Sequence, residues 1–222
     1  MAPPRKNSPF RLIVEGRDDK WSVINLLSRY GFDWQDPDVE GRPFVHHAGG
    51  VERLLSSVVP AVKSHPRVGF VLDADDDLEN RWQQITDRLM EAGLEVPSDP
   101  PTDGLVIDGY EGDGKVGVWL MPDNRIPGEL EDFIISLVPD DDPLIDFADE
   151  VTTEARAKGA PCTEGDHAKS TIHTWLAWQA KPGQPFGVAL TSETLSHDSE
   201  IAQRFVHWFT RLFAVEDSID LR

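Results

Sequence analysis

Residues 67–77 read RVGFVLDADDD, a nearly continuous apolar run followed by four aspartates within five positions. A short strand that is apolar along its whole length is typical of a parallel sheet whose two faces are both covered, because neither face is left for polar side chains. The stretch therefore predicts a buried strand over residues 67–72 with carboxylates just beyond its end.

The same pattern of strand, turn and helix occurs twice upstream. Residues 10–16 (FRLIVEG) predict a short strand that ends in a glycine turn, and a helix follows that Asp18 or Asp19 can cap. Residues 43–48 (PFVHHA) predict a second strand, and a pair of glycines separates it from a helix expected over residues 51–63. Tandem units of this kind predict parallel strands with helices packed on them.

The rest of the chain completes the expected fold. In the second helix Pro60 marks an expected kink or boundary. A third helix is expected over residues 77–93, and two strand-like runs over residues 105–121 indicate a hairpin. Apolar spacing is mainly helical after that. We predict an α/β fold, with a Rossmann-like parallel sheet and flanking helices over residues 10–138 and a helical C-terminal extension over residues 139–222.

Composition limits the class of protein. The chain has 222 residues, of which 39% are hydrophobic and 27% charged, as in globular proteins. No stretch approaches the roughly 20 apolar residues that a membrane-spanning helix needs. The N-terminus is basic and lacks an apolar core, so we expect no secretory signal. Cys162 is the only cysteine, which excludes an internal disulfide and predicts a reducing, cytoplasmic location.

The formal net charge of −19 bears on possible partners. It argues against a protein that binds nucleic acid over its whole surface, because Lys and Arg normally supply the affinity for nucleic acid by neutralising phosphates. It is compatible with a carboxylate site that binds divalent cations, since the bound ions reverse the charge locally. A basic partner subunit is another source of affinity.

Carboxylates follow two of the expected strands. Glu15 follows the first strand, and Asp73 and Asp75 follow the third. Functional groups collect beyond the carboxyl ends of parallel strands, and carboxylates brought together there repel one another unless they are protonated or bridged by cations. Oxygen ligands of this kind suit Mg²⁺ or Mn²⁺. The simpler interpretation is an acidic turn, and it is favoured for Asp76 and for Asp77, which can cap the next helix.

Three other kinds of acidic motif place aspartates in a partly similar pattern. A calcium loop is excluded because its sixth position is Leu78 rather than Gly and its twelfth is Gln84 rather than Glu. A haloacid-dehalogenase-type phosphatase would need a hydroxyl residue near Asp77. A metal-dependent nucleotide-sugar transferase often has a similar acidic stretch after a strand and remains an alternative, although it does not explain Glu15.

The segments LIVEGRDD (residues 12–19) and VLDAD (residues 71–75), with a glycine after the second strand between them, resemble the Toprim domain. This domain occurs in topoisomerases, primases, small ribosomal-RNA maturases and overcoming-lysogenization-defect (OLD) nucleases. The resemblance covers residues 10–121 and implies that Glu15 is an acid/base or metal ligand and that the two aspartates hold a divalent metal for phosphoryl transfer. Primase and topoisomerase members have a glycine soon after the second motif. This chain lacks it and is more similar to the stand-alone, OLD-type branch.

Residues 121–133 (MPDNRIPGELEDF) look similar to the third acidic motif of that branch. Glu129 and Asp132 share a face of the helix they open, ahead of Glu131 as candidates. With Asp123 they would complete a second metal site, as in-line attack on a phosphodiester often uses two cations about 4 Å apart. The alternative is that these acids only complement the helix dipole.

Lys169 stands near an expected helix start and matches the lysine that OLD-type nucleases carry after their last acidic motif. It would stabilise charge on a phosphate oxygen, or it is an ordinary surface lysine. His46 and His47 form only a weak metal candidate, and His167 and His173 are expected to be surface or packing residues.

These observations predict a stand-alone Toprim protein that cleaves phosphodiesters with Mg²⁺ or Mn²⁺, with two ions and DNA or RNA as substrate. Relatives of this kind often work beside an ATPase, so the resemblance also implies a defence effector with an ATPase partner. The aromatic residues at helical spacing between positions 175 and 213 are expected in the core, with a partner or dimer face as the alternative. A non-catalytic interaction module and the nucleotide-sugar transferase remain competing hypotheses.

Overall fold

The computed structural model of the protein describes residues 8–34, 42–110 and 114–214. A single five-stranded sheet in the order β2-β1-β3-β5-β4 is formed by β1 (Arg11–Val14), β2 (Phe44–His47), β3 (Arg67–Asp73), β4 (Leu105–Asp108) and β5 (Lys115–Met121). All neighbouring strands are parallel except β4, which pairs antiparallel with β5 at the edge. The α/β fold predicted from the sequence is confirmed. The tip of the expected hairpin, residues 111–113, lies outside the described residues.

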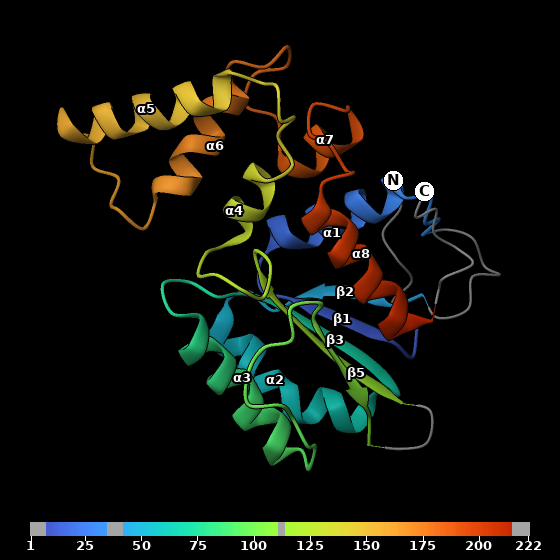
Figure 1. Ribbon diagram of the computed structural model, residues 1–222. Coiled ribbons are helices and arrows are strands. Elements are labelled where there is room, and N and C mark those ends of the chain that lie inside the picture. The colour runs from blue at the N-terminus through green and yellow to red at the C-terminus, as the bar shows by residue number, and fades with distance from the viewer. Residues whose placement is uncertain (1–7, 35–41, 111–113, 215–222) are drawn as a thin grey trace.

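Helices cover both faces of the sheet (Figure 1). They are α1 (Arg17–Arg29), α2 (Val51–Ser64), α3 (Leu78–Glu91), α4 (Leu130–Ile135), α5 (Leu144–Ala157), α6 (His167–Ala177), α7 (Phe186–Thr191) and α8 (Glu200–Phe213). One face carries α2 and α3, the opposite face carries α1 and α8, and α5 and α6 pack on each other away from the sheet. None of the helices described is long and apolar enough to cross a membrane.

The continuous apolar run of β3 is explained by the two cores that it separates. Phe70 and Leu72 pack with α2 and α3, whereas Val71 packs with α1 and α8. Side chains alternate between the faces of a strand, so a strand covered on both faces is apolar at every position.

The C-terminal helix α8 lies directly on the sheet over two glycines that are partners in the register of β3 and β5. A Cβ atom on Gly69 or on Gly117 would lie 2.7 Å from Cδ2 of Leu212, so both positions need a residue without a side chain. The indole nitrogen of Trp208 donates to the carbonyl oxygen of Leu105 at 2.9 Å. The extension after residue 138 therefore contributes α8 to the same core as the strands.

The aromatic residues expected in the core are mostly buried there. Trp178 is the exception, since it is 40% exposed and stacks on Phe147. The fully buried aromatic residues of this group are Trp175, Phe205, Trp208, Phe209 and Phe213, and Leu212 is buried beside them.

Local expectations were wrong at several element ends. Helix α1 begins at Arg17 with Gly16 as its N-cap, because Asp19 lies three residues inside and accepts from the N–H of Gly16 at 3.0 Å. Pro60 neither ends nor interrupts α2, whose buried residues on both sides of it hold the helix on the sheet. Helix α6 begins at His167, two residues before the predicted start, and the short α7 was not predicted.

Candidate active site at the carboxyl edge of the sheet

Glu15 and Asp73 lie side by side because they end neighbouring parallel strands. Val14 of β1 is the register partner of Val71 of β3, so the residues that follow meet at one edge of the sheet. The backbone N–H of Asp73 donates to Oε2 of Glu15 at 3.4 Å. Burial raises the pKa of Glu15, the hydrogen bond from Asp73 opposes this, and the charge of Asp75 raises the pKa further. The predicted neighbourhood of Glu15 and Asp73 is present.

The Asp73 carboxylate joins the sheet to α4. Its Oδ1 accepts from the backbone N–H of Leu130 at 2.9 Å, at the first residue of that helix. Burial raises the pKa of Asp73 well above its ordinary value, and the charges of Asp19, Glu15 and Glu131 add to the effect. Desolvation and like charges both disfavour the ionised form, so this carboxylate is in an environment that favours a proton or a cation.

Asp19 belongs to the same site, although the sequence suggested only a cap for it. One oxygen, Oδ2, accepts from Gly16, and a Cβ on that glycine would lie 2.8 Å from it. The other oxygen, Oδ1, is buried without a hydrogen-bond partner among the described residues. Burial raises the pKa of Asp19 to about 6, with repulsion from Glu15 and Glu131. The signal that could have identified it is its place in the motif VEGRDD, in the first turn of the helix that follows Glu15.

Glu129, Glu131 and Asp132 at the start of α4 have different environments. Glu129 is the N-cap residue, and Oδ2 of Asp132 accepts from its backbone N–H at 2.8 Å, which closes a capping box. Glu131 is only 7% exposed. Glu131, ranked behind the other two from the sequence, is therefore the buried acid of this helix, and one oxygen of Asp132 is occupied by capping.

Lys169 of α6 reaches these acids from a separate part of the chain. Its Nζ lies 3.1 Å from Oε1 of Glu131 and 3.7 Å from Oε2 of Glu129. Partial burial lowers the pKa of Lys169, but the hydrogen bond and charge of Glu131, with the charges of Glu129 and Asp73, outweigh it and raise the pKa. Lys169 is therefore paired with acids at the start of α4 and is not an isolated surface lysine.

Asp75 has a strained backbone and a charged partner of its own. Its φ of 52° lies in the left-handed region, and its backbone pairs with Gly128 through hydrogen bonds of 3.0 and 2.8 Å in both directions. Its carboxylate forms an ion pair with Arg81 of α3. Asp77, as expected, caps α3 by accepting from Asn80 N–H at 3.0 Å.

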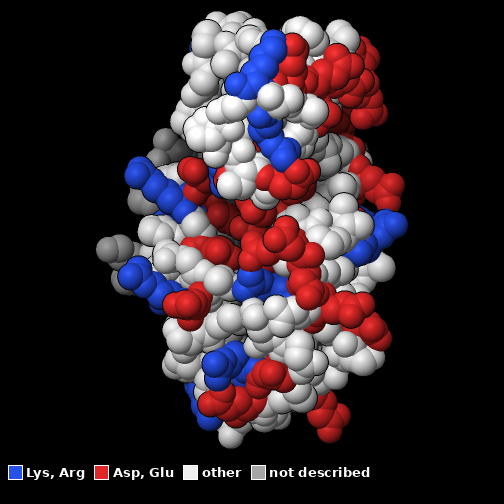
Figure 2. Space-filling model, turned by 90° about the vertical axis from the view of Figure 1, so that its left-hand side faces the viewer, with Lys and Arg blue, Asp and Glu red and all other residues white. Residues whose placement is uncertain are grey.

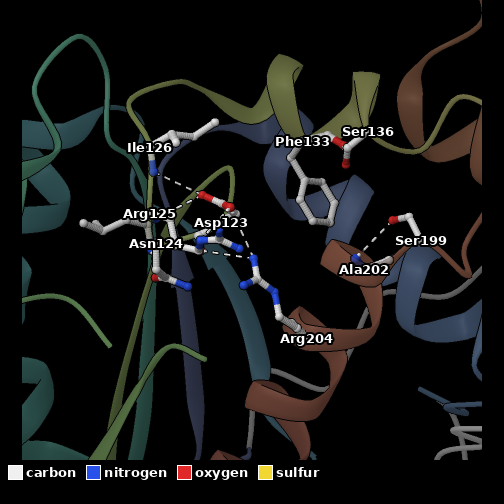
Figure 3. Close-up of polar contacts among 10 residues, drawn as sticks. Asp123, Asn124, Arg125, Ile126, Phe133, Ser136, Ser199, Ala202 and Arg204 are labelled. Atoms are coloured by element: carbon white, nitrogen blue, oxygen red, sulfur yellow. Dashed lines mark hydrogen bonds and ion pairs between the residues drawn. The ribbon is translucent and has the colours of Figure 1, made fainter. Parts of the chain in front are cut away.

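Asp123 has a structural contact in place of the metal role that the sequence suggested (Figure 3). Oδ1 accepts from the backbone N–H groups of Arg125 and Ile126 at 3.0 and 3.2 Å, and Oδ2 lies 3.3 Å from the guanidinium of Arg204 in α8. Both oxygens are engaged, so Asp123 ties the turn after β5 to α8.

His167 and His173 are in surface or packing positions, as expected, and the weak metal candidate His46 and His47 is a pair of stacked rings. His46 and His47 stack on each other at the end of β2 with ring centroids 6.0 Å apart. His167 pairs with Asp149 at 2.6 Å, and His173 stacks on the ring of Phe186.

The edge of the sheet thus carries a carboxylate cluster, and its members are Glu15, Asp19, Asp73, Asp75, Glu129 and Glu131. Figure 2 shows acidic side chains gathered across the middle of the face that lies at the left of Figure 1. Arg81 and Lys169 pair with members of this cluster from α3 and α6.

The donor chemistry of the cluster fits Mg²⁺ or Mn²⁺, because it consists of carboxylate oxygens and includes the unpaired buried Oδ1 of Asp19. In the described part of the chain, however, no three His, Cys, Asp or Glu side chains are already gathered closely enough to form a metal site.

A protein family matches the sheet and the C-terminal helices as one unit. The family is described as "Protein of unknown function (DUF3226)", and its model matches residues 9–214. No curated protein and no solved structure matches the chain. The match extends from β1 to the end of α8 and so includes every residue of the carboxylate cluster. Since it covers far more than half of the 222 residues, the chain belongs to the DUF3226 family.

Proposed function

We propose that this protein is a Mg²⁺- or Mn²⁺-dependent phosphodiesterase, a nuclease of the Toprim type suggested by its sequence motifs. One observation carries the proposal: carboxylates that follow β1 and β3 meet acids from the start of α4 at the carboxyl edge of the sheet, where the pKa values of Glu15, Asp73 and Glu129 are raised. In parallel α/β sheets this edge is the usual place for a functional site. Clustered groups with perturbed pKa values are typical of such sites.

The two halves of the cluster suggest two places for cations. Glu15, Asp73 and Asp75 follow β1 and β3 and would hold the first ion, with Asp19 beside them. Glu129 and Glu131 on α4 would hold the second, and Asp132 would join them through the oxygen that does not cap the helix.

The bound cations would supply Lewis-acid stabilisation of the phosphoryl oxygens and a water of lowered pKa. Glu15, whose own pKa is raised by burial, is suited to accept a proton from the attacking water. Lys169, held charged by Glu131, is suited to stabilise negative charge that develops on a phosphate oxygen.

The substrate and setting of the proposed reaction follow from the same features. Because the net charge is −19, the surface as a whole repels phosphates, and only the bound cations and local basic groups can attract them. DNA or RNA would therefore be held at this site rather than over the whole surface. We also propose a cytoplasmic location, because Cys162 has no second cysteine to pair with. An ATPase partner and self-association stay proposals: the first rests on the resemblance, and the aromatic residues of α8 do not support the second because they are buried in the core.

The competing functions are affected differently by the geometry. The position of Glu15 beside Asp73 weighs against a nucleotide-sugar transferase, because the motif of such an enzyme consists of the aspartates alone and does not explain Glu15. A non-catalytic module is favoured by the ion pairs of Arg81 and Lys169, which neutralise part of the cluster without a metal. Cleavage that depends on a divalent cation distinguishes the nuclease from such a module.

The proposal is tested by incubating the purified chain with labelled single- and double-stranded DNA and RNA, with Mg²⁺, Mn²⁺ or EDTA. We expect cleavage that needs the divalent ion and falls at least about a hundredfold in Glu15→Gln and Asp73→Asn. Asp87→Asn, on the exposed side of α3, is the matched control and should cleave as wild type. Full activity in Glu15→Gln, or no binding of Mn²⁺ at millimolar concentration, would refute a metal-dependent nuclease.

A further inference from the structure

Arg81 is a buried cation that the proposed reaction does not use. It lies on the first turn of α3, and the residue is only 8% exposed. One terminal nitrogen forms the ion pair with Asp75, and the other donates to Oε1 of Gln84 at 2.9 Å. Its Nε is buried and has no hydrogen-bond partner among the residues described. A guanidinium carries five N–H groups, so Arg81 has donors to spare.

The ion pair with Asp75 places the Arg81 guanidinium next to the proposed reaction centre. The positive charge of Arg81 lowers the pKa of Glu15, whereas the charge of its partner Asp75 raises it, so both charges act on the same carboxylate. A buried donor without a partner costs free energy that an incoming acceptor recovers. The planar fork of a guanidinium matches the oxygens of a phosphate, which can take two parallel N–H bonds.

Asp75 can change partner without moving its backbone. Hydrogen bonds with Gly128 on both sides of its peptide fix the main chain, at a φ of 52°. The Asp75 side chain can still rotate, so it can pair either with Arg81 or with a cation that Asp73 also binds. Because a carboxylate that is paired with a guanidinium is a poorer ligand, Arg81 and a metal ion compete for Asp75.

We propose that Arg81 is a phosphate-binding residue that exchanges partners: it holds Asp75 in the metal-free protein, and it binds a phosphate of the nucleic-acid backbone once a divalent cation has taken Asp75. This inference rests on the proposed function, whose substrate class it specifies further. The exchange orders the two binding events, with metal before nucleic acid. It also keeps the buried guanidinium paired with an anion in both states.

The first test measures Mn²⁺ binding by calorimetric titration without nucleic acid. Arg81→Met removes the competitor, so it should bind Mn²⁺ about tenfold more tightly than wild type, or about 1.4 kcal/mol. Arg88→Met, which removes an exposed arginine of the same helix, is the matched control and should leave the affinity unchanged. Equal or weaker Mn²⁺ binding by a folded Arg81→Met protein overturns the exchange.

The second test measures binding of a fluorescent oligonucleotide by anisotropy in Ca²⁺, which also takes oxygen ligands. Arg81→Met should bind it about tenfold more weakly and Arg81→Lys should be intermediate, because lysine keeps the charge but loses the fork. Asp75→Asn should show the reverse in EDTA, binding the oligonucleotide several-fold more tightly than wild type, since Arg81 is freed. This variant keeps the test available if Arg81→Met does not fold. Unchanged oligonucleotide affinity in the variants would overturn the phosphate-binding role.

The two proposals fail separately. If the wild type cleaves nucleic acid but Arg81→Met leaves the Mn²⁺ affinity unchanged, the nuclease proposal stands and the partner exchange is wrong. If the wild type does not cleave, but Arg81→Met binds Mn²⁺ more tightly and the oligonucleotide more weakly, the exchange occurs in a binding module and the nuclease proposal is wrong. If wild type binds neither Mn²⁺ nor oligonucleotide, both proposals are wrong.

Discussion

At the scale of single residues, the main feature is the electrostatic cost of the carboxylate cluster. Asp19 and Asp73 are desolvated, lie near each other and near Glu15, and have raised pKa values for these reasons. Such groups destabilise a metal-free protein in the pH range where they must ionise. A cation that pairs with them removes this cost, which links stability to the proposed chemistry.

The first prediction concerns pH. The pKa of Asp19 is raised from 3.8 to about 6, so between these values the folded state binds more protons than the unfolded state. The free energy of unfolding therefore falls as the pH rises through this window, by an amount on the order of 3 kcal/mol for this group, and the loss persists above it. Asp19→Asn can still accept from Gly16 but cannot ionise.

In EDTA, we expect Asp19→Asn to gain stability relative to wild type as the pH rises from about 4 to about 7. Urea unfolding at several pH values measures the difference. Asp146→Asn, an exposed acid of α5, should follow wild type throughout. Parallel pH profiles for wild type and Asp19→Asn would show that Asp19 ionises normally in the folded protein.

At the scale of elements, α4 shows how one short helix gives neighbouring acids different environments. Asp132 caps the helix through Glu129, whereas Glu131 is buried beside Lys169. The direction in which α4 leaves the turn after β5 decides which acid faces the cluster. The hydrogen bond from the N–H of Leu130 to Asp73 holds the start of α4 in that direction.

The second prediction separates these two acids. Asp132→Ala should lower the free energy of unfolding by about 1 kcal/mol, the usual value of a helix cap. Glu131→Gln should reduce Mn²⁺ affinity more strongly than Asp132→Ala does, because Glu131 is the buried acid of the pair. Urea unfolding and calorimetric titration measure the two effects. A greater loss of Mn²⁺ affinity in Asp132→Ala would make Asp132 the principal ligand of this helix.

The third prediction concerns the packing of α8 on the sheet. Gly117→Ala places a methyl group 2.7 Å from Leu212 and should destabilise the protein by about 1–3 kcal/mol, the usual cost of overpacking. Chemical unfolding measures the change. The double variant with Leu212→Ala should lose less stability than the sum of the two single variants, since the two changes share one space. If Gly117→Ala alone is as stable as wild type, the close approach of α8 is not required.

At the scale of the whole molecule, the site depends on segments far apart in the sequence. The carboxylates come from β1, β3 and α4 and their neighbours, Arg81 comes from α3, and Lys169 comes from α6 beyond the sheet. The overall charge of −19 adds general repulsion to the local repulsion within the cluster. Divalent cations should therefore stabilise the whole fold and not only the site.

The fourth prediction is that Mn²⁺ raises the unfolding temperature more than NaCl of equal ionic strength. Binding to the folded state alone stabilises it by about 2.7 kcal/mol when the free ion is at a hundred times its dissociation constant. Asp73→Asn should lose most of this specific increase while keeping the response to NaCl. Equal shifts from Mn²⁺ and NaCl would mean that the effect is general screening.

The sequence by itself determined the strand and helix units, the parallel sheet with its antiparallel edge hairpin, and the placement of Glu15 and Asp73 at the ends of strands. Apolar periodicity and turn residues act over a few positions, so a local reading can identify them. The cap at Asp77 is of the same kind. These features required no knowledge of which segments meet.

Only the tertiary structure decided which charged groups pair. Arg204 of α8 engages Asp123, and Lys169 of α6 selects Glu131. Arg81, six residues after Asp75, pairs with it across the turn between β3 and α3. The physical reason is that each carboxylate has several competing donors, and the winner depends on distances between elements that short-range patterns do not contain.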